Sequence, residues 1–135
     1  MSTRALYTFT DKRATVVVYK HGDGYPSGVA EQIAKALKFA WALPRFEASD
    51  FGAALVAANK TPGGGSLYLC STGDWKEAGH WDCEYRYDIS ATEDRLRVQA
   101  WTVHHDDEAG VWSEHQFYDG DLGGLEDAGL EEDTY

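Results

Sequence analysis

The chain has 135 residues, of which 43% are hydrophobic and 26% charged, and its formal net charge at pH 7 is −11. This length fits one domain that buries about two-thirds of the surface of its unfolded chain. The sequence contains no run of about 18 apolar residues for a membrane span and no basic-then-apolar N-terminus typical of a signal peptide. We therefore expect a cytoplasmic protein that contacts no membrane.

The negative charge is distributed unevenly along the chain. Residues 1–97 contain 12 Lys and Arg and 12 Asp and Glu, whereas residues 98–135 contain 11 Asp and Glu and no Lys or Arg. Such asymmetry indicates either an acidic interaction surface or a solvating tail. Direct nucleic-acid binding is disfavoured because it requires clustered Lys and Arg. A protein with a basic surface is the partner that this charge favours.

Two strands and two helices are predicted in the first 60 residues. The strands are Ala5–Thr10 and Thr15–Lys20, and a polar turn joins them as a hairpin. The three consecutive valines 16–18 indicate a strand buried on both faces, near the middle of a sheet. Apolar residues at spacings of three and four predict helices over Gly28–Trp41, ended by a Leu-Pro pair, and Phe51–Asn59.

Four further strands are predicted after a glycine-rich loop at Thr61–Gly65. A phosphate cradle in this loop is disfavoured, because a P-loop needs a Gly-Lys-Ser/Thr that opens a helix, and here a strand follows. The polar stretch Thr72–Asp82 is expected to be a long hairpin loop. The strands Cys83–Ile89 and Arg95–Val103 alternate polar and apolar residues, so each has one solvent-exposed face, and together they form an antiparallel hairpin. The four strands, in order, are Ser66–Ser71, Cys83–Ile89, Arg95–Val103 and Val111–Tyr118.

These elements predict a single α+β domain over residues 1–118. Its sheet has about six mainly antiparallel strands, and the two helices pack on one face. Residues 119–135 are acidic and glycine-rich, and are expected to form a C-terminal tail that is partly ordered at most.

The loop between the second strand and the first helix is the first candidate site. His21 could act as a general base oriented by Asp23, or the loop could bind a nucleotide or similar anion at the helix N-terminus, where Ser27 is the expected N-cap. Asp-Gly-Tyr-Pro is also ordinary turn chemistry, so a purely structural loop is the alternative. The possible ligand-binding residues are Arg4, Lys20, His21, Asp23 and Tyr25.

A zinc site is the second candidate. Cys70, His80 and Cys83 could bind zinc tetrahedrally with His104 or His105 as the fourth ligand. The spacing lacks a Cys-x2-Cys pair, and two cysteines in a reducing compartment are free thiols by default. We therefore expect neither a metal nor a cofactor.

Aromatic and acidic residues supply two further candidates. Trp and Tyr are enriched in interface hot spots, although most of those in so small a domain fill its core; the set comprises Trp75, Trp81, Tyr85, Tyr87, Trp101 and Trp112. The acidic residues lack the Asp-x-Asp-x-Asp-Gly pattern of a calcium loop, which leaves a solvated surface or a mimic of a phosphate backbone. The expected partner-binding residues are Asp106, Asp107, Glu108, Glu114, Asp119, Asp121 and Trp112. The acidic set also includes Glu126, Asp127, Glu131, Glu132 and Asp133, and the segment from Glu126 onward is expected to be a solubility tail.

Two segments carry a resemblance to known sequences: TRALYTF at Thr3–Phe9 and VYKHGDGYPSG at Val18–Gly28. Together with Trp41–Phe46 and Glu84–Tyr87, they resemble a family of small, mostly uncharacterised proteins of phages, prophages and plasmids. The resemblance implies a mobile-element context and brings no catalytic residues with it.

The charge and this resemblance together predict a non-enzymatic accessory protein. Its acidic C-terminal surface would occupy a basic, nucleic-acid-binding site on a host protein, as mobile-element inhibitors of restriction or CRISPR complexes often do. The alternative is a small nucleotide- or anion-binding protein or enzyme that uses the loop from His21 to Tyr25.

Overall fold

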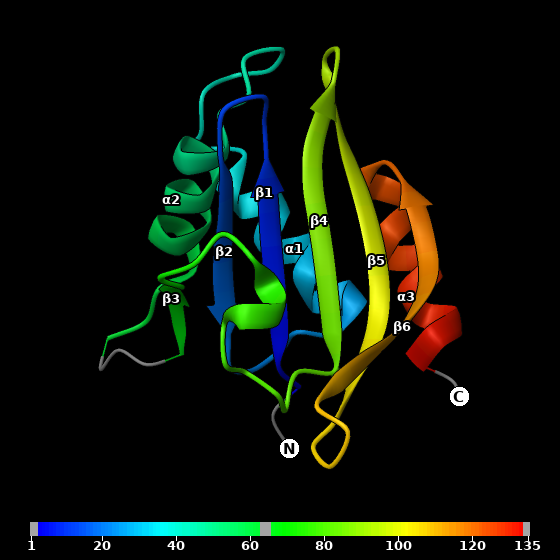
Figure 1. Ribbon diagram of the computed structural model, residues 1–135. Helices are drawn as coiled ribbons and strands as arrows, with labels where there is room; N and C mark the ends of the chain where they lie inside the picture. Colours follow the sequence, from blue (N-terminus) through cyan, green and yellow to red (C-terminus); the bar gives the residue numbers. More distant parts are fainter. Residues whose placement is uncertain (1–2, 63–65, 134–135) are drawn as a thin grey trace.

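A six-stranded sheet with the order β3-β2-β1-β4-β5-β6 is the centre of the fold (Figure 1). The computed structural model describes residues 3–62 and 66–133, with side chains as far as residue 128. The strands are β1 Ala5–Thr10, β2 Thr15–Lys20, β3 Leu67–Leu69, β4 Tyr85–Thr92, β5 Arg95–Asp106 and β6 Val111–Gly120. The helices are α1 Pro26–Ala36, α2 Ala48–Asn59, α3 Leu122–Asp133 and the short 3-10 helix η1 Trp75–Glu77. The α+β class and the mainly antiparallel six-stranded sheet are confirmed.

Strands β1 and β2 form the predicted hairpin, and their alternation sorts side chains onto the two faces of the sheet. Ala5, Tyr7 and Phe9 of β1 are fully buried against the helices, and Leu6 is fully buried on the opposite face. Burial on both faces explains the continuous apolar run of β2, because neither face of a central strand meets water.

The two predicted helices pack on one face of this sheet with shifted boundaries. Helix α1 begins at Pro26, whose missing N–H costs nothing in the first turn, and it ends at Ala36 rather than Trp41. Leu37, Phe39 and Trp41 are consequently exposed. Helix α2 begins at Ala48, three residues earlier than expected.

Asp11 explains the early start of α2. Its Oδ2 accepts a hydrogen bond of 2.7 Å from the N–H of Ala48, while its Oδ1 accepts from the N–H groups of Arg13 and Ala14. These hydrogen bonds lower the pKa of the Asp11 carboxyl. A side chain from the β1–β2 turn therefore satisfies the helix terminus that a local cap would otherwise serve.

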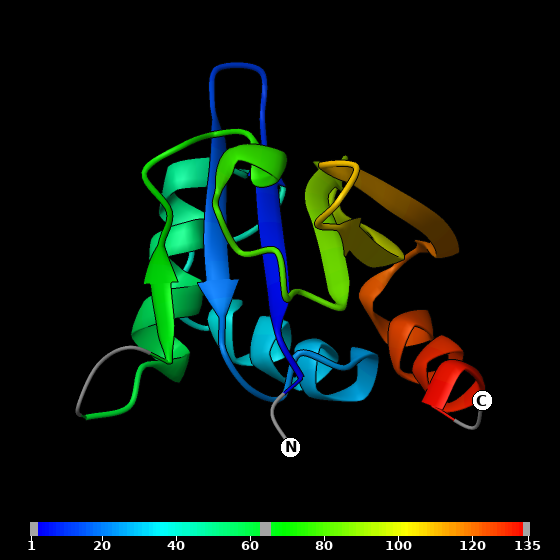
Figure 2. The same cartoon turned by 60° about the horizontal axis from the view of Figure 1, so that its bottom comes forward.

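The connection from β3 to β4 is a crossover, so the expected hairpin loop at Thr72–Asp82 is wrong. β3 pairs with β2 at one edge, whereas β4 pairs with β1 in parallel, with Tyr7 opposite Tyr87. Residues 70–84, including η1, cross the face opposite the helices (Figure 2). The crossover seals a second, smaller core in which Leu6, Val17, Tyr19, Cys83 and Val103 are buried.

The C-terminal segment is a helix where a tail was expected. Strand β6 continues to Gly120, and α3 follows and packs against α1 on the helix-covered face. Asp121 Oδ1 accepts the N–H of Gly124 at 2.9 Å, and Leu125 is fully buried in the main core. No helix in the described part of the chain is long and apolar enough to cross a bilayer.

Candidate functional site

The predicted ligand loop packs tightly against the body of the protein. Asp23 adopts a positive φ of 57°, and a Cβ on Gly24 would lie 2.7 Å from the Cβ of Ala5. The Gly24 carbonyl accepts the Tyr87 hydroxyl at 2.7 Å, and the Asp23 carbonyl accepts the amide of Gln32 at 3.1 Å. Backbone packing therefore accounts for the Asp-Gly sequence.

The start of helix α1 is also closely covered. A Cβ on Gly28 would lie 2.6 Å from the Asp23 carbonyl oxygen and 3.2 Å from the Tyr25 ring. A carbonyl oxygen at this place is itself an acceptor facing the first turn, so it competes with an anion for the helix terminus. The geometry favours the structural interpretation of the loop over the anion cradle.

The structure divides the five predicted ligand-binding residues between two places. Arg4 donates from Nε to Nδ1 of His21 at 3.4 Å, and the Tyr19 hydroxyl lies 2.9 Å from the same nitrogen. Lys20, Asp23 and Tyr25 instead line a separate pocket of about 220 Å³ beside α1. The antiparallel register, with Ala5 opposite Lys20, brings Arg4 and His21 to the same end of the hairpin, whereas no sequence pattern pointed to Tyr19.

The proposed zinc ligands do not converge. His80 stacks on Tyr19 with ring centroids 3.6 Å apart, and its Nε2 lies 3.0 Å from the Tyr68 hydroxyl. Burial lowers the pKa of His80 and raises those of the Cys70 and Cys83 thiols. Among the side chains that the structure describes, in residues 3–62 and 66–128, no group of three or more His, Cys, Asp or Glu could hold a metal ion.

Most of the predicted partner-binding carboxylates have intramolecular partners. Glu114 pairs with Arg86 at 2.6 Å, and Asp119 pairs with Arg97 at 2.8 Å. Asp106 accepts N–H groups in the β5–β6 turn, as Asp121 does at the start of α3. The acidic set is thus spread from this turn along β6 to α3.

Arg86 of strand β4 has a buried guanidinium that forms an ion pair with Glu114 of strand β6. Arg86 is 8% exposed, and its guanidinium carbon lies 3.6 Å from the ring centroid of Trp101 and 4.8 Å from that of Trp75. Nη1 donates to Asp88 at 2.8 Å, while Nε and Nη2 reach Glu114. These aromatic residues are therefore part of the second core.

A pocket of about 610 Å³ lies between residues 79–84 and the end of β5. Trp81, 58% exposed, stacks on His105 with centroids 4.9 Å apart and planes 9° apart. His105 meets Trp112 edge-on at 5.0 Å, and its Nδ1 lies 2.7 Å from Oδ1 of Asp107. The pocket contains aromatic, imidazole and carboxylate groups and no Lys or Arg; its lining is Gly79–Glu84, Val103–His105 and Asp107.

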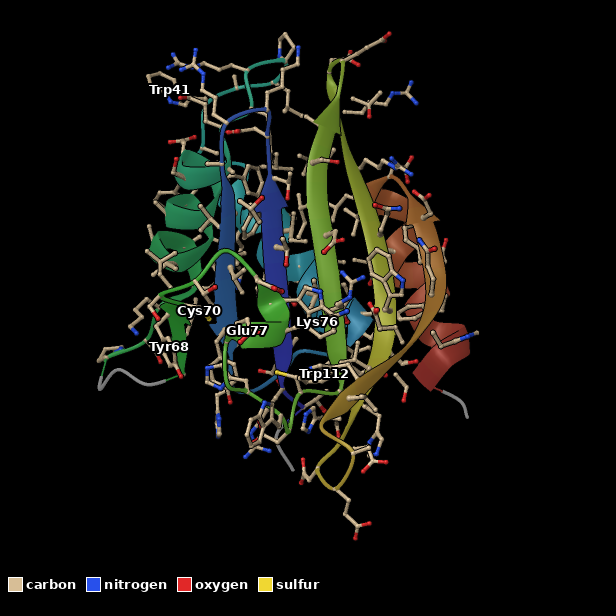
Figure 3. The ribbon with its side chains drawn as sticks, in the orientation of Figure 1. Trp41, Tyr68, Cys70, Lys76, Glu77 and Trp112 are labelled. Carbon is tan, nitrogen blue, oxygen red and sulfur yellow. The ribbon has the colours of Figure 1, made fainter. Side chains whose placement is uncertain are left out.

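Sequence reasoning placed the members of this pocket in three different groups. His80, His104 and His105 belong to the candidate zinc ligands, Trp81 to the interface aromatics and Asp107 to the acidic surface. Trp112 adjoins the pocket through its contact with His105. It is the crossover and the β5–β6 turn that bring them together. Figure 3 shows Trp112 and Tyr68 toward the same end of the sheet, and Trp41 at the other end.

Comparisons with known proteins add no relative. No family model, no curated protein and no solved structure matches the chain.

Proposed function

We propose that the protein is a non-enzymatic binder that uses an acidic C-terminal surface to occupy a basic site on another protein. The observation that carries the proposal is the composition of residues 98–135, which hold 11 Asp and Glu and no Lys or Arg. The fold gathers these residues along one side of the molecule, formed by the end of β5, β6 and α3 (Figure 1). We call this the acidic side.

Ion pairing leaves most of the negative charge of the acidic side available. Arg86 and Arg97 neutralise Glu114 and Asp119, so these two contribute little to attracting a partner. Carboxylates that accept only N–H groups keep their charge, as Asp106 does. Exposed carboxylates that take part in no ion pair among the described residues lie in the β5–β6 turn and on α3, and include Asp106, Glu108, Glu126 and Asp127.

A nucleic-acid-binding surface is the basic site that these charges fit best. The carboxylates of the β5–β6 turn and of α3 present negative charge as the phosphates of a nucleic acid do, and complementary charge accelerates association. The resemblance to mobile-element proteins supports a host protein as the partner, so we propose an anti-defence or anti-CRISPR-like inhibitor.

A matched pair of variants tests the proposal. The acidic-side variant D106N/E108Q/E126Q/D127N removes four charges, and the asparagine that replaces Asp106 keeps a side-chain oxygen to accept the N–H groups of the turn. The control variant E31Q/E77Q/E93Q/D94N removes four charges from other exposed positions. Both variants have the same net charge, so only the location of the change differs.

Tagged wild-type and variant proteins are used to capture partners from the producing host, with mass spectrometry and salt titration as readouts. We expect a partner that the wild type and the control variant retain, that the acidic-side variant loses, and that releases its nucleic acid on binding. Rising salt should slow association, because charges are screened over about 8 Å at physiological ionic strength. Capture that is equal for both variants and indifferent to salt would contradict the proposal.

A further inference from the structure

Two of the three carboxylates that line the pocket beside Trp81, those of Glu84 and Asp107, pair with no Lys or Arg of the described residues. Asp107 is 79% exposed, and only its Oδ1 is engaged, by His105. Glu84 is exposed and makes no ion pair among the described residues. Asp82 is already neutralised by Arg4 at 3.0 Å. The pocket therefore presents two carboxylates next to an exposed indole.

The same protein twice combines an indole, a carboxylate and a guanidinium. Arg86 lies 3.6 Å from the Trp101 ring centroid and pairs with Glu114. At the other end of the sheet, Arg45 lies 3.8 Å from the Trp41 ring centroid and pairs with Glu47 at 2.8 Å.

The pocket supplies the first two parts of this arrangement and lacks the third. Its indole is Trp81, and its carboxylates are those of Glu84 and Asp107.

We propose that this pocket binds an arginine side chain of a protein partner. The guanidinium lies over the Trp81 ring and donates hydrogen bonds to Asp107 and Glu84. The inference rests on the proposed function, for which it identifies the anchor: the basic partner inserts one arginine at the end of the acidic side nearest the β5–β6 turn.

Arginine fits this pocket better than lysine. A guanidinium is planar, so it can stack on an indole while donating two parallel hydrogen bonds to a carboxylate, whereas an ammonium is a compact and strongly hydrated point charge. His105 stacks on one face of the Trp81 ring, and Trp81 is 58% exposed, so the other face of the indole is open to a guanidinium. Tryptophan is the best aromatic partner for a cation.

The test uses three peptides: N-acetyl-Gly-Arg-Gly-amide and the same peptide with citrulline or lysine in place of arginine. Citrulline keeps the shape of arginine and removes its charge. Binding is followed by the indole Nε1–H resonances in two-dimensional NMR spectra of ¹⁵N-labelled protein. The Trp81 resonance is assigned from its loss in W81A.

We expect the arginine peptide to shift the Trp81 resonance with a millimolar dissociation constant, and the citrulline peptide to bind at least about tenfold more weakly. Lysine should lie between them. The variants E84Q and D107N should each weaken arginine binding several-fold, whereas W41A, which removes a similarly exposed indole at the other end of the sheet, should leave it unchanged.

Equal binding of the arginine and citrulline peptides, arginine binding that survives W81A, or the lack of any Trp81 shift at about 10 mM peptide would overturn the inference. An unshifted resonance of Trp101, which packs against Arg86 away from the pocket lining, shows that E84Q and D107N remain folded. The four-residue acidic-side variant leaves Trp81, Glu84 and Asp107 intact. The arginine site is therefore tested with W81A, E84Q and D107N, and the proposed function is tested with the four-residue variant, so that the two hypotheses can fail independently.

Discussion

Replacing Arg86 with alanine should destabilise the protein strongly. The substitution leaves Asp88 and Glu114 without their cation and opens a space between Trp75 and Trp101. Removing one partner of a buried ion pair costs about 3–5 kcal/mol. Because the two carboxylates retain side-chain exposures of 32% and 30%, we expect the lower end of this range, about 3 kcal/mol.

The free energy of unfolding is measured by urea denaturation, with Arg97→Ala as the matched control. Arg97 makes a similarly short ion pair with Asp119, but both side chains are more than 40% exposed, so its loss should cost at most about 1 kcal/mol. Hydrogen exchange should also show faster opening of β6 in the Arg86 variant. Equal losses for the two variants would refute the argument that burial makes the Arg86 cluster important.

The pH dependence of the Arg86 variant supplies a second check. Burial raises the pKa of Asp88 above its usual 3.8 although Arg86 opposes the shift. A carboxyl whose pKa is higher in the folded than in the unfolded state favours the folded state only while it is protonated. The protein therefore loses stability as the pH rises through the unfolded-state pKa of this group. Loss of Arg86 enlarges this cost, so the difference from the wild type should be smaller near pH 4 than at pH 7.

Three further results are expected. Gly24→Ala should lower the melting temperature by several degrees, while Gly22→Ala, where an added Cβ meets nothing within 4 Å, should leave it almost unchanged; similar effects would contradict the packing of the loop. The NMR titration midpoint of His80 should lie below 6.5, and its preference for the neutral form in the folded state should reduce stability as the pH falls through 6.5; a midpoint above 6.5 would contradict this. In the native protein, Cys70 should react with a thiol reagent faster than the more deeply buried Cys83, and the reverse order would contradict the placement of Cys83 in the second core.

Local patterns in the sequence were enough to predict the strands but not the pairing of β4. Alternation predicts that Tyr85, Tyr87 and Ile89 lie on one face of the strand, and in the structure this face packs in the main core. The pairing of β4 with β1 joins residues about 80 positions apart in sequence, and no turn signal reports such a contact. The polar stretch Thr72–Asp82 is compatible both with a hairpin loop between antiparallel neighbours and with a crossover to a distant strand.

Helix α3 was missed because its own residues favour helix weakly. Glycine disfavours the helix interior by about 1 kcal/mol relative to alanine, and α3 contains three glycines. The helix is stabilised by the hydrogen bond from the N–H of Gly124 to Asp121 and by the burial of Leu125 in the main core. The paired states of Glu114 and Asp119 were likewise unpredictable, because their partners lie on other strands.

The parallel pairing of β1 and β4 makes the chain divisible. The strands on one side of this seam all come from residues 5–69 and those on the other from residues 85–120, so each half of the sheet is continuous in sequence. A cut in the crossover would separate two fragments, each with its own hairpin and at least one helix. We expect such fragments to reassemble when mixed, which makes the protein a candidate for a split reporter whose halves rejoin through the β1–β4 pair and the packing of α1 against α3.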